Sequence, residues 1–221
     1  MVGRRRFVTG GLAAAVSVVI APASTRAQSA YLTTAEMLQR SRASEVDAYR
    51  QYTAFTRQAK TDGYPGIAYL FTALASAEFI HGQNFEKILV RLGAELTPLP
   101  VRQIQAANTH QNLIKAAADE LDSVYTFYPG ILKQLKPEGF KDAITMTNYA
   151  WESEKQHLDI LKAIQQWSPN HFEAVAKKIE NETAQYFVCQ NCGATTIKIP
   201  QEKCPICKLP SANFRKIDPP L

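Results

Sequence analysis

The feature that most constrains the fold of this chain is a pattern of glutamate and histidine that occurs twice. In each copy a lone glutamate is followed, 33 or 34 residues later, by the tetrapeptide Glu-x-x-His. Residues three apart lie on one face of a helix, so each tetrapeptide can present both side chains to one metal ion. Four carboxylates and two imidazoles from four helices form the ligand set of a carboxylate-bridged di-iron centre in a helix bundle. The candidate ligands are Glu45, Glu78 and His81, and Glu120, Glu154 and His157.

A single Glu-x-x-His on an amphipathic helix usually marks a solvated face, and this is the alternative interpretation. The matched second copy argues against it, and so do apolar neighbours such as Phe79 beside Glu78 and the Trp151 side chain shortly before the second tetrapeptide. Hard carboxylates with some imidazole suit iron or manganese. His110 and His171 fall near predicted helix starts, and we assign them no role.

The four cysteines of the chain form two Cys-x-x-Cys pairs near its C-terminus, Cys189 with Cys192 and Cys204 with Cys207. The pairs are separated by 11 residues, a pattern typical of a tetrahedral four-sulfur metal site. The spacing fits a redox iron and a structural zinc equally well. Two disulfides in an exported protein are a further alternative.

Apolar spacing and turn signals predict a mainly α chain, with a four-helix bundle followed by a small C-terminal domain. Residues 33–36 read Thr-Thr-Ala-Glu and predict a capping box at the start of the first helix. Residues 96–107, which contain two prolines, predict the long crossover of a ferritin-like bundle. Short β-prone runs at 186–188 and 195–199 belong to the small domain. The predicted helices span 33–59, 66–92, 108–135 and 140–166, and the predicted domains are the bundle at 28–167, a linker helix at 168–184 and the cysteine domain at 185–221.

Residues 1–27 have the features of a twin-arginine export signal. Arg4 and Arg5 are followed by one spacer residue and two apolar residues. The apolar stretch 9–20 is too short to span a bilayer as a helix. Ala27 provides a small residue at the expected cleavage position. Export of a folded protein would let metals load, and cysteines be ligated, before the oxidising periplasm is reached. We therefore expect a periplasmic protein; an ordinary secretory signal or an uncleaved anchor is the alternative.

The formal charge of +5 is concentrated in this segment, because four arginines lie within it. Without them the charge is +1, and the remaining chain has no basic run, so we expect no nucleic-acid partner. No other apolar run approaches membrane length, so we expect no stable membrane span.

In combination these motifs resemble the rubrerythrin family, in which a ferritin-like di-iron bundle precedes a rubredoxin-like domain. The resemblance covers residues 30–217. It implies that the six glutamates and histidines bind two irons, with manganese as another fitting metal, and that the cysteines bind one iron, with zinc as the alternative. It also implies reduction of hydrogen peroxide with electrons relayed through the cysteine site. A homodimer is implied, in which the rubredoxin-like domain of one subunit approaches the bundle of the other.

Two tyrosines resemble residues that surround the metal ligands in this family. Tyr52 lies seven residues after Glu45, and Tyr128 precedes a proline in the third predicted helix. The alternative for either is a core tyrosine with a satisfied hydroxyl. One position departs from the family, because Ser123 stands where a further glutamate usually follows the third-helix ligand, and the adjacent Asp122 is turned away by about 100° on an ideal helix.

The serine at this position bears on the reaction, since the family's extra glutamate lets one iron change ligands with redox state. We expect a more symmetric site, in which His81 stays bound in both states, and chemistry shifted towards dioxygen. The leading hypothesis is a peroxide-reducing di-iron oxidoreductase with an unknown electron donor. The alternatives are an iron-handling ferroxidase and a non-enzymatic scaffold with zinc in the cysteine site.

Overall fold

The computed structural model describes residues 30–165, 172–181 and 184–220. The predicted export signal at 1–27 and the predicted start of the linker helix at 168 lie outside these ranges. Within them, no helix is both long enough and apolar enough to cross a membrane.

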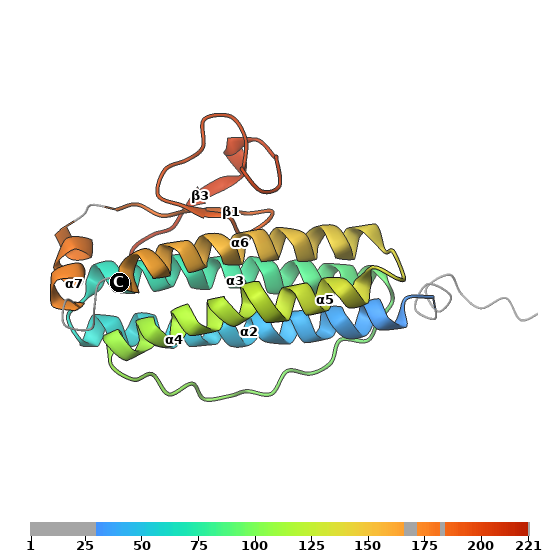
Figure 1. The fold of residues 1–221 in the computed structure, drawn as a ribbon, viewed down its shortest axis with the longest axis horizontal. Helices are drawn as coiled ribbons and strands as arrows, with labels where there is room; N and C mark the ends of the chain where they lie inside the picture. Colours follow the sequence, from blue (N-terminus) through green and yellow to red (C-terminus); the bar gives the residue numbers. More distant parts are fainter. Residues whose placement is uncertain (1–29, 166–171, 182–183, 221) are drawn as a thin grey trace, which may run out of the picture.

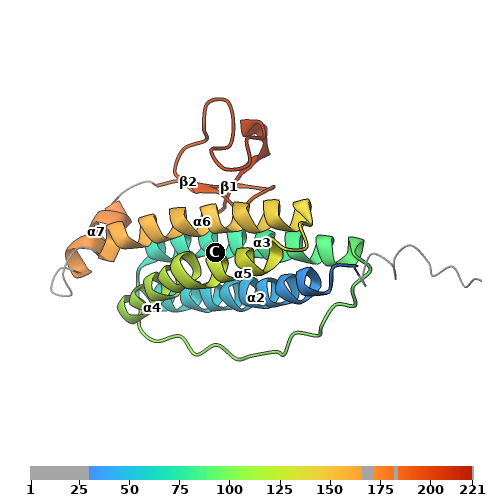
Figure 2. The same cartoon turned by 45° about the vertical axis from the view of Figure 1, so that its right-hand side comes forward.

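Four long helical segments form a bundle, which confirms the predicted mainly α fold (Figure 1). The first two pack along most of their length, and the last two close the bundle (Figure 2). The outer boundaries of all four segments agree with the sequence prediction to within two residues. The segments are α2 (Leu32–Thr61), α3 (Pro65–Arg91), α4 (Thr109–Asp122) continued through η1 (Ser123–Phe127) and α5 (Tyr128–Leu135), and α6 (Lys141–Gln165).

The third segment was predicted as one α-helix, but a π-helical turn interrupts it at η1. In a π pattern the carbonyl of Val124 would pair with the N–H five residues on, which is Pro129 and has none. The indole Nε1 of Trp151 donates to the Val124 carbonyl instead, at 2.8 Å. A missing donor and an inserted side chain together account for the irregular turn.

The start of α2 corrects the capping-box prediction, because its N-cap is Tyr31 and no side chain of the helix itself caps it. The carboxylate of Glu138, from the turn before α6, accepts from the N–H groups of Thr33 at 2.9 Å and Thr34 at 2.8 Å. A remote carboxylate therefore satisfies the free N–H groups that a local glutamate was expected to satisfy.

The crossover between α3 and α4 has no helix or strand and runs along the outside of the bundle (Figure 1). Its end is held at two points. Asn108 caps α4 by accepting from the Gln111 N–H at 2.9 Å. Asp62, at the end of α2, accepts from the Thr109 N–H at 2.8 Å and from its hydroxyl at 2.7 Å. These contacts set where α4 begins and thus the height of Glu120 in the bundle.

Two apolar clusters fill the bundle on either side of its middle. One is built around Phe55, Phe71 and Leu74, and the other around Phe85 and Leu135. Burial of these side chains supplies most of the driving force for folding. The candidate metal ligands of α2 and α3 lie at intermediate positions along those helices, between the two clusters.

The C-terminal segment forms a small antiparallel sheet of order β2-β1-β3, and it lies over α3 and α6 (Figures 1 and 2). Strand β2 is shorter than the predicted β-prone run at 195–199, and β3 was not predicted. A further helix precedes the sheet within the predicted linker. The elements are α7 (Phe172–Asn181), β1 (Phe187–Cys189), β2 (Thr195–Thr196) and β3 (Phe214–Lys216).

Candidate metal centres

The six predicted ligands of the bundle meet in its interior, and each is at most 4% exposed. Their ligand atoms form two groups, and within each group all the ligand atoms lie within 4.8 Å of one another. Glu78 and Glu154 belong to both groups, so these two carboxylates are placed to bridge two ions. The first group adds Glu45 and His81, and the second adds Glu120 and His157.

The two groups have nearly the same geometry around their histidines. The Nδ1 atom of His81 lies 3.0 Å from Glu78, 3.1 Å from Glu154 and 3.4 Å from Glu45. The Nδ1 atom of His157 lies 3.2 Å from Glu78, 3.3 Å from Glu154 and 3.6 Å from Glu120. The imidazole rings are stacked, with centroids 6.1 Å apart. Each Nδ1 therefore faces a cluster of carboxylate oxygens.

Several of these oxygens are poorly satisfied by the protein, which indicates whether the site suits cations. Within the described ranges, Oε2 of Glu120 is buried without a hydrogen-bond donor, while Oε1 of Glu78 and Oε1 of Glu154 each face a histidine Nδ1 that is shared with other carboxylates. Leaving a buried charged acceptor unsatisfied is costly, and a bound cation removes that cost. The residues present thus fit two divalent ions with oxygen and nitrogen ligands.

The protonation behaviour of the cluster reflects burial and close packing of like charges. Burial, aided by the neighbouring carboxylates of Glu154 and Glu78, raises the pKa of Glu45 to about 8. Burial and the Glu154 charge also raise the pKa of Glu120 well above its ordinary range. Burial opposes ionisation of Glu154 too, but hydrogen bonds to His157 and His81 outweigh it and lower its pKa. The raised pKa values of Glu45 and Glu120 mean that these carboxyl groups would exchange protons for cations on metal binding.

The two predicted tyrosines contact the outer carboxylates of the cluster. The Tyr52 hydroxyl donates to Oε1 of Glu120 at 2.5 Å, and the Tyr128 hydroxyl donates to Oε1 of Glu45. Both tyrosines are at most 1% exposed, and burial is the main cause that raises the pKa of each phenol well above its ordinary value. Each tyrosine lies on a different helix from its carboxylate and would orient one ligand of one bound ion.

The C-terminal sheet contacts the far side of both histidines, which sequence reasoning missed. Nε2 of His81 lies 3.1 Å from the Cys192 carbonyl, and Nε2 of His157 lies 3.2 Å from Oγ1 of Thr195. A carbonyl only accepts hydrogen bonds, so Nε2 of His81 carries a proton that it donates to Cys192, and Nδ1 is the nitrogen on which a metal would replace a proton. Nothing in the sequence around Cys192 and Gly193 indicates that this backbone contacts a histidine 111 residues away.

The family resemblance implied that the tail of one subunit approaches the bundle of another. In this structure the approach is made within one chain, because Cys192 and Thr195 contact buried histidines on α3 and α6 of the same chain.

His110, to which no role was assigned, stacks on Phe172 with centroids 4.6 Å apart. His171 lies outside the described residues.

The four cysteines are buried and converge on a single point. The Sγ atoms of Cys192 and Cys204 are 3.5 Å apart and those of Cys189 and Cys207 are 3.7 Å apart, far beyond a disulfide bond. All four are free, which rules out the two-disulfide alternative in this structure. Hydrogen bonds from Cys189 and Cys192 lower the pKa of Cys204 to about 2, so one thiolate is already favoured. The set fits one tetrahedral metal ion.

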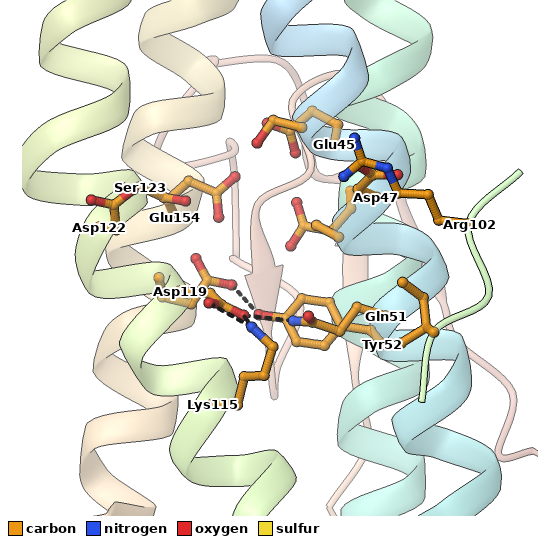
Figure 3. A pocket seen from close by; sticks show the side chains of 15 residues that line it. Glu45, Asp47, Gln51, Tyr52, Arg102, Lys115, Asp119, Asp122, Ser123 and Glu154 are labelled. Carbon is orange, nitrogen blue, oxygen red and sulfur yellow. Dashed lines mark hydrogen bonds and ion pairs between the residues drawn. The ribbon is translucent and has the colours of Figure 1, made fainter. Parts of the chain in front are cut away.

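A cavity of about 330 Å³ leads to the bundle site, and all four of its glutamates line the inner wall. Ser123 and Asp122 both line it (Figure 3). At the rim, Arg102 of the crossover pairs with Asp47 at 3.2 Å, and Lys115 pairs with Asp119 at 2.8 Å. The small side chain of Ser123 thus forms part of the wall of the cavity that the four glutamates line.

A four-helix bundle with a buried dinuclear carboxylate–histidine site, joined to a four-cysteine site, defines a two-centre metalloprotein of the di-iron carboxylate class. Comparison with protein families makes the assignment specific. Residues 36–165 match the Rubrerythrin family, and residues 187–215 match the rubredoxin-like domain of rubrerythrin. The chain therefore belongs to the rubrerythrin family.

Individual relatives agree with this assignment. Rubrerythrin-2 of Clostridium acetobutylicum is 27% identical over 182 residues, which cover 82% of this chain and 95% of that protein. Nigerythrin of Nitratidesulfovibrio vulgaris is 31% identical over 185 residues, covering 82% and 85%. The fully reduced, all-ferrous structure of nigerythrin superimposes with a TM-score of 0.71 at 30% identity, over 83% of this chain and 86% of that one. Membership supports an oxidoreductase with a di-iron-type site and a rubredoxin-like metal site.

A more distant likeness concerns the fold alone. A bacterioferritin of Desulfovibrio desulfuricans superimposes with a TM-score of 0.64 at 22% identity, over 69% of this chain and 90% of that one. This agrees with a ferritin-like bundle.

Proposed function

We propose that the protein reduces hydrogen peroxide to water at two irons in the bundle, with electrons delivered through one iron held by the four cysteines. The observation that carries the proposal is the 3.1 Å contact between the Cys192 carbonyl and Nε2 of His81. A ligand of one centre thereby touches a ligand of the other, and the path between the two centres consists of this hydrogen bond and the few covalent bonds within Cys192 and His81. A zinc ion in the cysteine site would make that contact purely structural.

The residues divide the work of this reaction among them. When bound, a pair of reduced irons supplies the two electrons that, with two protons, convert one hydrogen peroxide into two waters. Glu78 and Glu154 would hold the ions side by side, because their carboxylates belong to both ligand groups. Tyr52 keeps its hydroxyl proton directed at Glu120, beside the cavity through which the oxidant enters. The apolar clusters on either side exclude water from the rest of the bundle interior.

A Cys189→Ser variant tests the relay. It removes one cysteine ligand and no ligand of the bundle site, so peroxide should still oxidise a chemically reduced bundle site. Turnover with an external electron donor should be lost. Undiminished steady-state peroxide reduction by this variant would contradict the relay. Metal analysis of the purified protein should find about three irons per chain, two in the bundle site and one in the cysteine site.

A second candidate is oxidation of ferrous iron by dioxygen, and Ser123 is the observation that favours it. Without the family's additional carboxylate, the two ligand groups are closely similar, each with one histidine. A Ser123→Glu variant should then raise the rate with peroxide relative to the rate with dioxygen. Iron uptake well beyond three ions per chain would favour the ferroxidase.

We also propose that the protein is exported to the periplasm by the twin-arginine route and acts as a homodimer. The N-terminal arginine pattern supports the first proposal, and the family resemblance supports the second. Arg4→Lys with Arg5→Lys should retain the protein in the cytoplasm, and fractionation of cells checks this. Sedimentation of the mature protein checks the dimer.

A further inference from the structure

The outer nitrogen of His157 lies in a dry environment built from two parts of the chain. Nε2 of His157 is 3.2 Å from Oγ1 of Thr195 on β2 and 3.4 Å from Oγ of Ser153, one turn earlier on α6. The exposed fractions are 0% for His157, 3% for Thr195 and 0% for Ser153. Water therefore has little access to this nitrogen, and a protein group must satisfy it.

The hydroxyl of Thr195 has a fixed direction. Its Oγ1 lies 3.1 Å from the Gly193 carbonyl, which can only accept, so the single hydroxyl proton is donated there. The lone pairs of the same oxygen are left to accept from Nε2–H of His157. The chain of bonds runs from imidazole to hydroxyl to carbonyl, and it places the imidazole proton on Nε2. Nδ1 faces the carboxylates of the metal site, and it is the nitrogen that would bind an ion once its proton is displaced.

We propose that Thr195 is a positioning residue for the metal ligand His157, through which the cysteine domain tunes the metal affinity and the reduction potential of the bundle site. Outer hydrogen bonds of this kind set the tautomer and the orientation of a metal-binding histidine and make it a stronger ligand. Thr195 lies in the same short segment as Cys192 and Gly193, so correct folding around the four cysteines places its hydroxyl. The inference rests on metal binding by His157 and does not depend on which oxidant the protein uses.

The neighbouring residue supplies a matched control. Thr196 is on the same strand, and its hydroxyl is buried without a hydrogen-bond partner in the described part of the chain. Thr195→Val and Thr196→Val make the same chemical change one residue apart, and valine is the β-branched isostere of threonine. Only the first change removes an acceptor from His157.

The test uses the full chain with the cysteine site loaded, and measures binding of iron(II) without oxygen by competition with a chelator. Thr195→Val should weaken the binding of the iron(II) ion held by the group that contains His157 by about 10- to 100-fold, and Thr195→Ser should restore it. The reduction potential of the bundle site should rise in the valine variant, because a weaker ligand stabilises the ferric state less. Thr196→Val should leave both quantities as in the natural protein.

Two results would overturn the proposal. One is an affinity and potential of Thr195→Val equal to those of Thr196→Val. The other is a loss seen only in Ser153→Ala, which would assign the positioning to Ser153. If Thr195→Val does not fold, as judged by circular dichroism, Thr195→Ala and Thr195→Ser are compared instead. They differ only by the hydroxyl, so equal affinities in this pair would also overturn the proposal.

Discussion

Nε2 of His81 lies 3.1 Å from the backbone carbonyl of Cys192, so a ligand of the bundle site and a ligand of the cysteine site touch within a single chain. The next residue, Gly193, is packed against the same imidazole, with φ at +77°. A methyl group at Gly193 would overlap the His81 ring. The close approach of the two centres therefore depends on glycine at this position.

Replacing Gly193 by alanine should separate the two centres. The overlap with His81 should push the cysteine domain off α3, and electron transfer from the cysteine site to the bundle site should slow. The left-handed conformation of alanine should lower the free energy of unfolding by about 1–2 kcal/mol. Strain from the overlap should lower it by a further amount of about 1–3 kcal/mol. Stopped-flow reduction of the bundle site measures the rate, and chemical denaturation measures the stability.

Gly63→Ala is the control for that variant. Gly63 also has a positive φ, of +84°, but an added methyl group there meets no atom within 4 Å. It should show the conformational cost alone and an unchanged rate of electron transfer. If both variants transfer electrons equally fast, the contact at His81 is not the route.

The shared carboxylates should differ from the outer ones in how many ions they hold. Glu78→Gln removes an anionic ligand from both groups, so both ions should bind more than about 100-fold more weakly, a larger loss than that of an outer hydrogen bond. Glu45→Gln removes a ligand from one group only, so the ion near Glu120 and His157 should stay. Metal analysis after dialysis distinguishes the two. Equal stoichiometry in both variants would contradict the bridging assignment.

Removing the Tyr128 hydroxyl should destabilise the metal-free protein. In Tyr128→Phe, Oε1 of Glu45 loses its donor inside the bundle, which should lower the free energy of unfolding by about 1–3 kcal/mol. Tyr125→Phe, at a side chain that is 66% exposed, should change it by less than about 0.5 kcal/mol. Urea denaturation of both variants without metal makes the comparison, and equal stabilities would show that the hydroxyl contributes nothing.

The contact between Asp62 and Thr109 should make stability depend on acid pH. The hydrogen bond from the Thr109 hydroxyl is the main cause that lowers the pKa of Asp62 from its ordinary value of 3.8. A lowered pKa in the folded state gives stability that is present above pH 3.8 and is lost as the pH falls through the lowered pKa. Asp62→Asn should therefore be less stable than the natural protein at pH 7, by about 1 kcal/mol or less, and the difference should vanish in acid.

A double-mutant cycle with Thr109→Val completes that test. If the two side chains stabilise the start of α4 together, the losses from Asp62→Asn and Thr109→Val should not add at pH 7. Additive losses would show that Asp62 acts through another group, such as Gln58, which donates to its other oxygen at 2.8 Å.

The sequence alone was sufficient for the bundle, its six metal ligands as candidates and the cysteine site. Helical period and ligand spacing are local properties, and Glu78 with His81, or Cys189 with Cys192, must lie together on any regular element that carries them. Prediction from neighbouring residues was wrong where a residue distant in the sequence forms the hydrogen bonds that a local group was expected to form. The local cap predicted for α2 was displaced by Glu138, and the third helix was interrupted where Trp151 replaces the N–H that Pro129 lacks.

The tertiary structure alone decided how the two centres meet. Nothing in the spacing of the cysteines indicates that the Cys192 carbonyl touches His81 or that Thr195 accepts from His157. Nor does it indicate which glutamates are shared by two ions, since that depends on how four helices pack. These relationships join residues 38 to 111 positions apart, and they arise because buried polar atoms must find partners wherever the fold brings one within reach.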